Sequence, residues 1–355
     1  KSLTTLETLL NGFTTLSARS AGRNEMSHLD MFSARDLEDL CQETSSRLKI
    51  TPVVVEKDYW TCWVLDRLFS DSLVRGQIMF KGGTTLSKVF GLIERFSEDI
   101  DMILNWDMLK GQLGPMEAQR SKTKQDKFNK RSVAASREYL KEEFHGSVRR
   151  ALGETVQTEI PYDDPDVIEI TYPRSFEDPY LRPKIRLEIG PLARWGPNGQ
   201  FTITPYVAEA FPALFSNPRI TVRAINDEWT FWEKATILHQ EAHRPSGKAQ
   251  PGRYSRHYYD LMRMAISVKR QNYLERIDLL EEVVYFKKKY YPCAWASYDS
   301  AKPGSMKLVP VRERVKDLKL DYQQMKTMIF GEVPEFDSLM EILQDLEDSI
   351  NRDPR

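Results

Sequence analysis

The sequence predicts an α+β fold, in which a small mixed sheet with flanking helices is followed by a helical C-terminal domain. Two patterns and the chain length support this. Short apolar runs rich in β-branched residues occur at 78–80, 167–172, 184–190 and 219–222, and such runs are typical of strands. From about Asp227 onward the apolar residues recur at helical spacing instead. A length of 355 residues suggests two domains, or one core with a substantial extension.

Three parts follow one another along the chain. Residues 5–17 and 30–48 are predicted to form short amphipathic helices joined by a polar link, and they either pack on the core or bind a partner. A stronger helix is predicted at 52–70, where large apolar residues form one side. We therefore expect a helical N-terminal extension, a core that carries the motifs, and a helical C-terminal domain, with the ranges 1–47, 48–226 and 227–355.

The composition is that of a soluble protein with a sizeable core, because 41% of the residues are hydrophobic and 29% are charged. No apolar run approaches the roughly 20 residues that span a bilayer, and the first residues do not resemble a secretion signal. The three cysteines are far apart and form no Cys-x-x-Cys motif. We therefore expect a cytoplasmic protein without a membrane partner. The net charge of −1 implies that any RNA contact must use a local basic patch.

A glycine turn links the first predicted strand to a helix. The strand at 78–80 leads almost directly into Gly82, Gly83 and Thr84. Paired glycines allow backbone N–H groups to approach an anion, and the start of a helix adds its dipole at the same place. The apolar residues that follow lie at i, i+3, i+4 and i+7, which predicts a helix that ends near Arg95. The turn is therefore predicted to hold phosphate groups.

Two aspartates follow on the next predicted strand. Residues 97–104 alternate with period two, so Asp99 and Asp101 point to one side while Ile100 and Met102 point into a core. Adjacent carboxylates repel each other unless a cation lies between them, which predicts a divalent metal, Mg²⁺ or Mn²⁺. Phosphate beside a divalent metal indicates nucleotidyl transfer, in which a hydroxyl attacks the α-phosphate of an NTP and pyrophosphate leaves.

This order of motifs resembles the nucleotidyltransferase superfamily with the polymerase β-like fold, whose hallmark is Gly-Gly-Ser/Thr, a helix and then Asp-x-Asp. More narrowly, the chain resembles the AbiEii family of toxins from type IV toxin–antitoxin systems, which includes the MenT tRNA-modifying toxins. The narrower resemblance depends on segments at 50–60, 231–236, 258–261 and 328–336. It covers roughly residues 48–350, and about the first forty-five residues have no match. The resemblance implies a polymerase β-like core for the predicted sheet.

The resemblance also implies a third carboxylate, which usually completes such a metal site from a neighbouring strand. Glu188, within the predicted strand at 184–190, is the candidate. The alternative for Glu188 is an ordinary ion pair on the strand face with Arg186 or another neighbour. The predicted metal ligands are therefore Asp99, Asp101 and Glu188.

Lys234 and Asp260 match positions that the family uses in its active site. The resemblance implies that Lys234 neutralises the triphosphate and that Asp260 orients Lys234 or Arg256. Lys88 could reach phosphate oxygens from the helix after the turn, and Arg256 could bind nucleotide phosphate or tRNA. The predicted catalytic residues are Asp99, Asp101, Glu188, Lys234 and Asp260, and the predicted nucleotide-binding residues are Gly82, Gly83, Thr84, Lys88 and Arg256. Arg95 and Glu98 are interpreted as a structural pair, and Lys81 as structural.

Two further patterns leave alternatives open. His239 and His243 lie at i and i+4, which suits a metal, although helix-end histidines are more often caps. The basic stretch at 109–137 is predicted to begin as a loop at Gly111, Gly114 and Pro115, and to continue as a helix through 150. That stretch is either a surface for the RNA backbone or a solvated helix face.

We therefore expect a metal-dependent nucleotidyltransferase toxin that transfers a nucleotide from an NTP to RNA. The resemblance implies the tRNA 3′ acceptor end as the target, blocked translation as the result, and a cognate antitoxin encoded beside the toxin. One alternative is transfer to a protein or a small molecule. Another is a nucleotide-binding partner protein without turnover, which would not need a metal pair. An extended basic groove across 120–150 and 287–289 would favour RNA.

Overall fold

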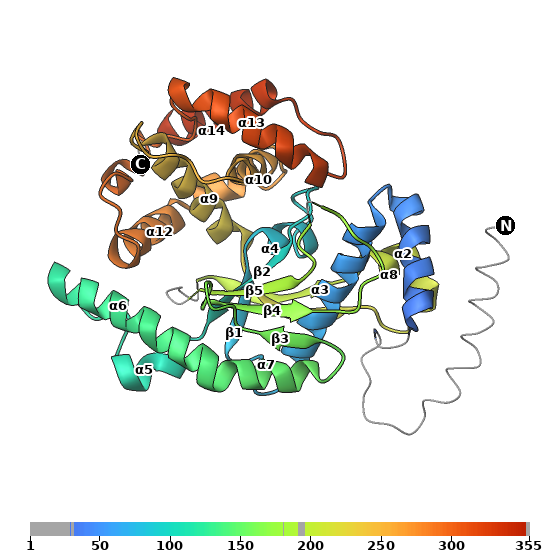
Figure 1. Ribbon diagram of the computed structural model, residues 1–355. Coiled ribbons are helices and arrows are strands. Elements are labelled where there is room, and N and C mark those ends of the chain that lie inside the picture. Colours follow the sequence, from blue (N-terminus) through green and yellow to red (C-terminus); the bar gives the residue numbers. More distant parts are fainter. Residues whose placement is uncertain (1–28, 30–31, 180, 191–195, 353–355) are drawn as a thin grey trace.

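The structure is a computed structural model that describes residues 29, 32–179, 181–190 and 196–352 (Figure 1). Within these ranges the strands form a seven-stranded mixed sheet in the order β3-β4-β5-β2-β1-β7-β6. β1 is antiparallel to β2 and parallel to β7, and β2 is parallel to β5. The strands are β1 (Ile78–Lys81), β2 (Asp99–Leu104), β3 (Gln157–Glu159), β4 (Val167–Thr171), β5 (Ile185–Gly190), β6 (Asn198–Ile203) and β7 (Ile220–Ile225).

Alternation along the central strands gives the sheet an apolar face and a charged face. On the apolar face, Phe80 lies beside Met102, and Ile100 lies beside Leu187, all fully buried. The residues between them point the other way, so the opposite face carries Lys81, Asp99, Asp101, Arg186 and Glu188. One face therefore builds the core and the other is available for chemistry.

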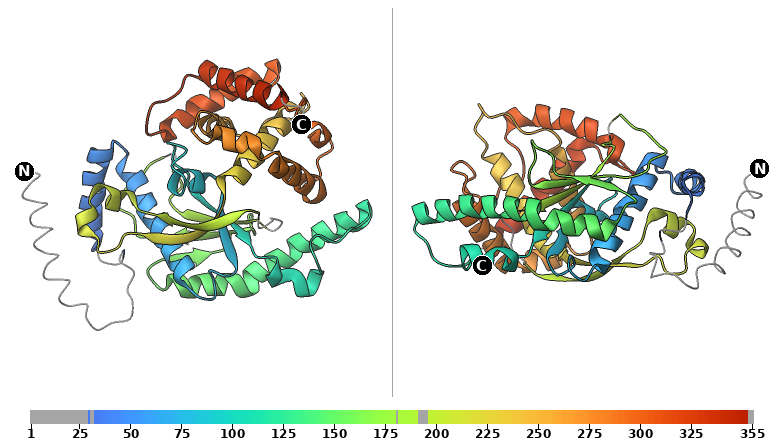
Figure 2. Two further views of the ribbon diagram at one scale, coloured as in Figure 1. Left: turned by 180° about the vertical axis from the view of Figure 1, so that it is seen from behind. Right: turned by 60° about the horizontal axis from the view of Figure 1, so that its bottom comes forward.

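Helices cover the apolar face. α3 (Pro52–Ser70) begins with Pro52 at its first turn and is buried on most sides between the sheet and α2 (Ala34–Leu48). α6 (Lys122–Tyr139), a π turn (Leu140–Phe144) and α7 (His145–Leu152) follow one another as one long rod along the sheet (Figures 1 and 2). Apolar side chains from the π turn and α7 join α3 and the strands in one hydrophobic core.

The C-terminal helices form a second core over part of the charged face (Figure 1). Met79 and Ile103 contribute to this core from the sheet, so the helices are anchored beside the aspartates. The backbone N–H of Phe96 donates to the carbonyl of Met328 at 2.8 Å, which joins the entrance of β2 to the C-terminal part. The helices are α9 (Asp227–Ala242), α10 (Ser255–Ala265), α11 (Arg270–Glu275), α12 (Ile277–Tyr290), α13 (Arg312–Met325) and α14 (Phe336–Arg352).

A small third cluster joins α12 to α6. Phe286 and Tyr290 pack against Met116 and Phe128, and the Tyr290 hydroxyl donates to the carbonyl of Met116 at 2.6 Å. Asn129 donates to the carbonyl of Lys289 at 2.9 Å. The rod and the C-terminal helices therefore meet at one end of the charged face.

The predicted α+β class is confirmed, and so are helices at 52–70 and after 227. The helix predicted to reach Arg95 was wrong, because α4 (Gly83–Lys88) ends at Lys88. Gly91 has a φ of 61°, and the N–H of Leu92 returns to the carbonyl of Leu86 at 2.8 Å, so the chain turns away from the helix axis. Gly111, predicted in a loop, lies within α5 (Asp107–Leu113).

Other outcomes concern segments with weak patterns. β3, β6 and α8 (Tyr206–Ala210) were not predicted, because β3 and α8 are short and β6 begins with Asn198 and Gly199. The helix predicted at 5–17 lies outside the described residues, and the division of the chain at 47/48 and 226/227 stays a prediction. None of the helices in the described part of the chain is long and apolar enough to pass through a membrane.

Candidate active site

Three carboxylates share the charged face of the sheet. Asp99 and Asp101 come from β2, and Glu188 on β5 lies directly beside Asp101 in the strand register. Burial raises the pKa of Glu188, and the charges of Asp99 and Asp101 raise it further. Burial and the charge of Asp99 also raise the pKa of Asp101, although Lys81 opposes them. The three acids therefore repel one another across two adjacent strands.

The donor set of this cluster fits a divalent cation. Carboxylate oxygens are the ligands that Mg²⁺ prefers, and a cation would relieve the repulsion that raises these pKa values. As the side chains stand, no three acidic, histidine or cysteine residues within the described ranges are gathered closely enough to hold an ion. Glu188 also lies 3.4 Å from Nε of Arg186, so the alternative ion pair is present beside the cluster.

The glycine turn lies against these acids. Gly82 has a φ of 84°, and a Cβ there would lie 2.0 Å from Oδ2 of Asp101. A Cβ on Gly83 would lie 2.8 Å from Oγ of Ser97 and 2.9 Å from Nη2 of Arg95. Neither position has room for a side chain, so the turn backbone packs directly on the site. The buried Thr84 hydroxyl donates to the carbonyl of Asp99 at 2.6 Å, which fixes α4 against β2.

Lys88, a predicted nucleotide-binding residue, contacts other partners than the three carboxylates. Its Nζ lies 2.9 Å from Oδ1 of Asp58, donates to the carbonyl of Thr204 at 2.7 Å and lies over the ring of Tyr206. Burial would lower the pKa of Lys88, but the charge of Asp58 together with smaller contributions from other neighbours outweighs burial, and the pKa is raised. Because α4 is short, Lys88 points from its end toward α3 and α8, where it joins those helices.

A buried cluster of opposite charges lies on the other side of the turn. Asp260 on α10 is fully buried and accepts from Nε and Nη2 of Arg95 at 2.6 and 2.7 Å, and from Nζ of Lys234 on α9 at 2.7 Å. Burial would raise the pKa of Asp260, but the charges of Arg95 and Lys234 hold it well below its usual range. Burial and the charge of Arg95 lower the pKa of Lys234, against the effect of Asp260.

The predicted contact between Asp260 and Lys234 is therefore present. The predicted pair of Arg95 and Glu98 was wrong, because each has a stronger partner elsewhere. Glu98 accepts from Nζ of Lys57 at 3.1 Å and from the backbone N–H of Arg182 at 2.8 Å, and it also pairs with Arg253. Burial would raise the pKa of Glu98, but Lys57 and Arg253 lower it. Lys57 from α3 thereby holds the entrance of β2 in place.

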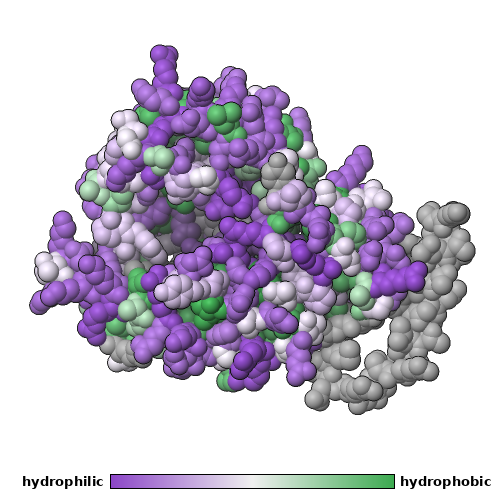
Figure 3. Space-filling view, in the orientation of Figure 1, coloured by the Kyte–Doolittle hydropathy of each residue, from purple (hydrophilic) through white to green (hydrophobic). Residues whose placement is uncertain are grey.

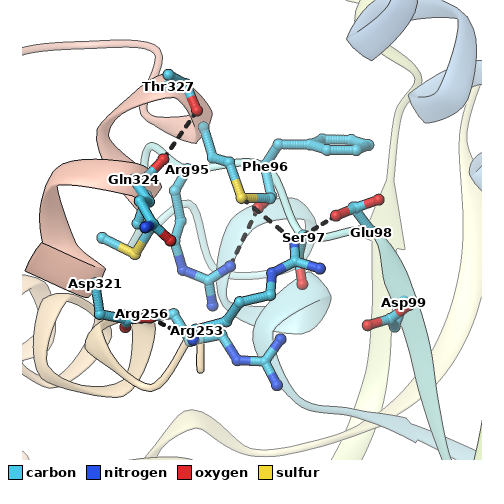
Figure 4. Close-up of a pocket in the computed structure, with 12 residues that line it drawn as sticks. Arg95, Phe96, Ser97, Glu98, Asp99, Arg253, Arg256, Asp321, Gln324 and Thr327 are labelled. Atoms are coloured by element: carbon cyan, nitrogen blue, oxygen red, sulfur yellow. Dashed lines mark hydrogen bonds and ion pairs between the residues drawn. The ribbon is translucent and has the colours of Figure 1, made fainter. Parts of the chain in front are cut away.

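A pocket opens between the entrance of β2 and helices α10 and α13 (Figure 4). Figure 4 shows Arg253 and Arg256 reaching from the helical side toward Glu98 and Asp99. The charge of Arg256 lowers the pKa of both Asp101 and Glu188, so Arg256 faces the acid cluster. Asp321 on α13 accepts from the backbone N–H groups of Arg253 and Ser255, at 2.5 and 2.7 Å, which holds the start of α10.

Two residues of the site were interpreted as structural from the sequence and were not predicted to belong to it. Lys81, interpreted as structural, lies beside Asp101 in the register, and its Nζ is 4.0 Å from Oε1 of Glu233. The charge of Glu233 raises the pKa of Lys81, and Asp101 and Glu188 add to this against burial. The position of Lys81 at the end of a strand, directly before the glycines, is the sequence feature that could have identified it as a site residue. No sequence feature identifies Arg95, because its partner Asp260 is 165 residues away in the chain.

The histidine alternative is not supported by the contacts. Nε2 of His239 lies 3.1 Å from the carbonyl of Ser297, and Nδ1 accepts from the backbone N–H of Lys307 at 3.0 Å. Both ring nitrogens of His239 are therefore engaged by the backbone. Nδ1 of His243 lies 2.8 Å from the carbonyl of His239, as expected of a helix-end contact.

The two basic segments named in the sequence come together. A pocket between α6 and α12 is lined by Arg120 and Lys122 from one side and by Lys288 and Lys289 from the other, with Tyr285 beside them. The space-filling view is hollowed between the C-terminal helices and the sheet-bearing part (Figure 3). The pocket between α6 and α12 is therefore a basic groove at the place where the two parts of the protein meet.

Comparison with known proteins gives one family. The family model described as "Nucleotidyl transferase AbiEii toxin, Type IV TA system" matches residues 63–344. None of the curated proteins compared with the chain matches it. Among solved structures, the chain is similar to MenT4, a nucleotidyltransferase toxin from Mycobacterium tuberculosis H37Rv, with 13% identity and a TM-score of 0.36, over 87% of this chain and 97% of that one.

Proposed function

Because residues 63–344 match its model, the chain belongs to the AbiEii family of nucleotidyltransferase toxins of type IV toxin–antitoxin systems, and from this we propose that it transfers a nucleotide from an NTP to RNA. The proposed acceptor is the 3′ end of tRNA, whose modification would prevent aminoacylation and stop translation. The proposed partner besides NTP and RNA is a cognate antitoxin. The observation that carries the reaction is the row of three carboxylates beside the glycine turn, faced by cationic side chains.

Each side of this arrangement suits one part of the reaction. Asp99, Asp101 and Glu188 would hold Mg²⁺ or Mn²⁺, which when bound would supply charge stabilisation at the α-phosphate and the attacking oxygen. Glu188 lies beside Asp101 in the strand register, so its carboxylate would be placed to accept the proton of the acceptor hydroxyl. The backbone of Gly82 and Gly83 lies close enough to the acids for a triphosphate to contact both.

The cations on the helical side are suited to orient the triphosphate. Lys234 is fixed by Asp260, which is itself fixed by Arg95, so the ammonium group is positioned before a ligand arrives. Burial and the charge of Arg95 lower the pKa of Lys234, so a phosphate bound nearby would favour its charged form. Arg256 faces the acids from the same side and would contact the same phosphates.

The groove between α6 and α12 supports RNA as the acceptor. Lys122 and Lys288 are exposed there, and cations spaced along a groove favour a phosphate backbone over a small molecule. The groove meets the C-terminal helices that also carry Lys234, so an acceptor lying in it would have its end near the charged face of the sheet.

The test uses purified protein with Mg²⁺, each α-³²P-labelled NTP in turn, and total cellular RNA. The double variant Asp99→Ala/Asp101→Ala is the test variant, and the exposed Asp163→Ala is the matched control. We expect label on a tRNA-sized band with the wild type and with Asp163→Ala, but not with the double variant. NTP binding without labelled RNA would overturn the RNA assignment and direct the search to a protein or small-molecule acceptor.

A further inference from the structure

A second pocket lies next to the acid cluster, between α9, α12 and the sheet. Its floor includes Lys81 from β1 and Ile103 from β2. Ile103 lies two residues beyond Asp101 on the same face of β2, which is about 7 Å along a strand. Lys81 and Glu233 line this pocket and also contact each other beside the acids. The pocket therefore adjoins the proposed reaction centre through Lys81, which lies beside Asp101 in the strand register.

The walls of this pocket are flat and mostly apolar. Trp229 and Phe286 are buried, and Tyr291 remains 46% exposed at the mouth. The amide of Gln240 is oriented by Tyr298, whose hydroxyl donates to Oε1 at 2.6 Å, which leaves the amide nitrogen as a donor. Apolar walls with a few fixed polar groups are typical of ligand pockets, and aromatic walls suit a planar ring.

A buried lysine also lines this pocket. Nζ of Lys287 donates to the carbonyl of Glu233 at 3.2 Å. Burial lowers the pKa of Lys287 to about 8, and the charges of Lys81 and Lys234 oppose the effect of Glu233. Tyr291 lies close enough to Lys81 to influence its pKa. A ligand that joins a planar ring to a phosphate would therefore meet both the ring walls and an under-compensated cation.

We propose that this pocket binds a nucleobase at the reaction centre, an assignment that rests on the proposed nucleotidyl transfer. The base belongs either to the terminal nucleotide of the acceptor or to the incoming NTP. The adjoining groove favours the acceptor, because α12 carries Phe286 and Lys287 into this pocket and Lys288 and Lys289 into the basic groove. An RNA strand could thus stack its last base in the pocket while its backbone follows the groove.

The test measures binding by fluorescence anisotropy with two pairs of probes. One pair is a 5′-labelled RNA hairpin with a single-stranded 3′ end and the same RNA with an abasic last nucleotide. The other pair is each NTP against tripolyphosphate, measured by competition with a labelled NTP. Tyr291→Ala removes the ring at the mouth, Tyr291→Phe retains it, and Gln240→Leu removes the amide. Tyr162→Ala, at a fully exposed tyrosine, is the matched control.

We expect Tyr291→Ala to weaken binding of the intact RNA about 10-fold and to leave the abasic RNA unchanged. Tyr291→Phe and Tyr162→Ala should bind like the wild type. Weaker NTP binding without a change for tripolyphosphate would support the pocket with the NTP as the source of the base. Equal effects on both members of each pair, or no effect on any probe, would overturn the proposal.

The two proposals fail in different ways. Base-dependent binding that Tyr291→Ala removes, in a protein that transfers no nucleotide to RNA, would reject the proposed function and keep the pocket assignment. Transfer to RNA by the wild type, with the base-dependent part of binding unchanged in Tyr291→Ala and Gln240→Leu, would reject the pocket alone. Circular dichroism of each variant shows whether a loss of binding reflects a loss of fold.

Discussion

The charged face of the sheet and the Arg95–Asp260–Lys234 cluster lie on either side of the same glycine turn, yet the pKa values of their carboxyl groups are shifted in opposite directions. On the sheet, Asp101 and Glu188 lie beside each other and their pKa values are raised. In the cluster, Asp260 is fully buried between two cations and its pKa is well below its usual range. Burial acts on both sets, so the difference comes from their neighbours.

This difference distinguishes acids that need a cation from an acid, Asp260, whose charge is already compensated and which serves as a scaffold for Arg95 and Lys234. A carboxylate with satisfied hydrogen bonds and two cations has little to gain from a further ion. Adjacent carboxylates with raised pKa values gain stability when a cation arrives. The comparison therefore assigns metal binding to the acids of the sheet face, and it assigns to Asp260 the positioning of Arg95 and Lys234. Each assignment can be tested separately.

The largest expected effect is on turnover. Asp101→Asn removes a charge from the acid cluster while keeping its size, so we expect nucleotide transfer to fall by about 10³-fold or more. The measurement is the rate of label incorporation at saturating NTP and Mg²⁺, with Asp163→Asn as the control. Transfer within about 10-fold of wild type would show that the chemistry lies elsewhere.

The next largest effect is on stability. Asp260→Asn leaves Arg95 and Lys234 buried without a counter-charge, and we expect the free energy of unfolding to fall by about 3 kcal/mol. The pKa of Asp260 is lowered in the folded state, so its contribution to folding stability is fully present at pH values above its ordinary pKa. That contribution is lost only as the pH falls through the ordinary pKa and below it. The loss should therefore be the same throughout pH 6–8 in urea unfolding. A loss below about 1 kcal/mol would contradict the scaffold role.

A smaller effect is expected at the turn between the two regions. Gly82→Ala places a Cβ against Oδ2 of Asp101 at a φ of 84°, so either Asp101 or the turn must move. We expect about a 10²-fold loss of transfer, since misplacement by about 1 Å has an effect of this size. Gly76→Ala is the control, because a Cβ there meets nothing within 4 Å. Equal activity of the two variants would show that the close approach at Gly82 is not required.

The smallest expected effect is on the free energy of unfolding without divalent metal, when the adjacent acids destabilise the folded protein. The raised folded-state pKa of Asp101 means that the folded protein binds more protons than the unfolded chain as the pH rises above 3.8. Stability is lost as the pH rises through that window, so the cost is fully present at neutral pH. Asp101→Asn without divalent metal should therefore be about 0.5 kcal/mol more stable than wild type at pH 7.5, and less so at pH 4.5.

Urea unfolding with and without Mg²⁺ measures this difference. Added Mg²⁺ should stabilise the wild type more than Asp101→Asn, because only the wild type retains all three carboxylates. A variant that is less stable than the wild type at pH 7.5 without metal would show that Asp101 is compensated by its neighbours. The comparison between the sheet face and the cluster would then no longer hold.

The sequence by itself determined the parts whose pattern is local. Period-two alternation placed Asp99 and Asp101 on one side of a strand, and the strand register places them side by side with the residues of β1 and β5. The paired glycines and the helix at 52–70 were likewise predictable, because turn chemistry and helical periodicity depend on neighbours in the chain. The family resemblance, which depends on such local segments, is confirmed by the match over residues 63–344.

Only the tertiary structure decided which charges meet across the chain. The α4 helix ends at Lys88 rather than near Arg95, so Lys88 joins Asp58 while Arg95 turns to Asp260. Glu98 meets Lys57 instead of Arg95, and Lys81 comes to lie beside Asp101. Long side chains of one charge are interchangeable in a sequence pattern, and their partners are selected by the folded positions of distant helices and strands, where burial makes every mismatch costly.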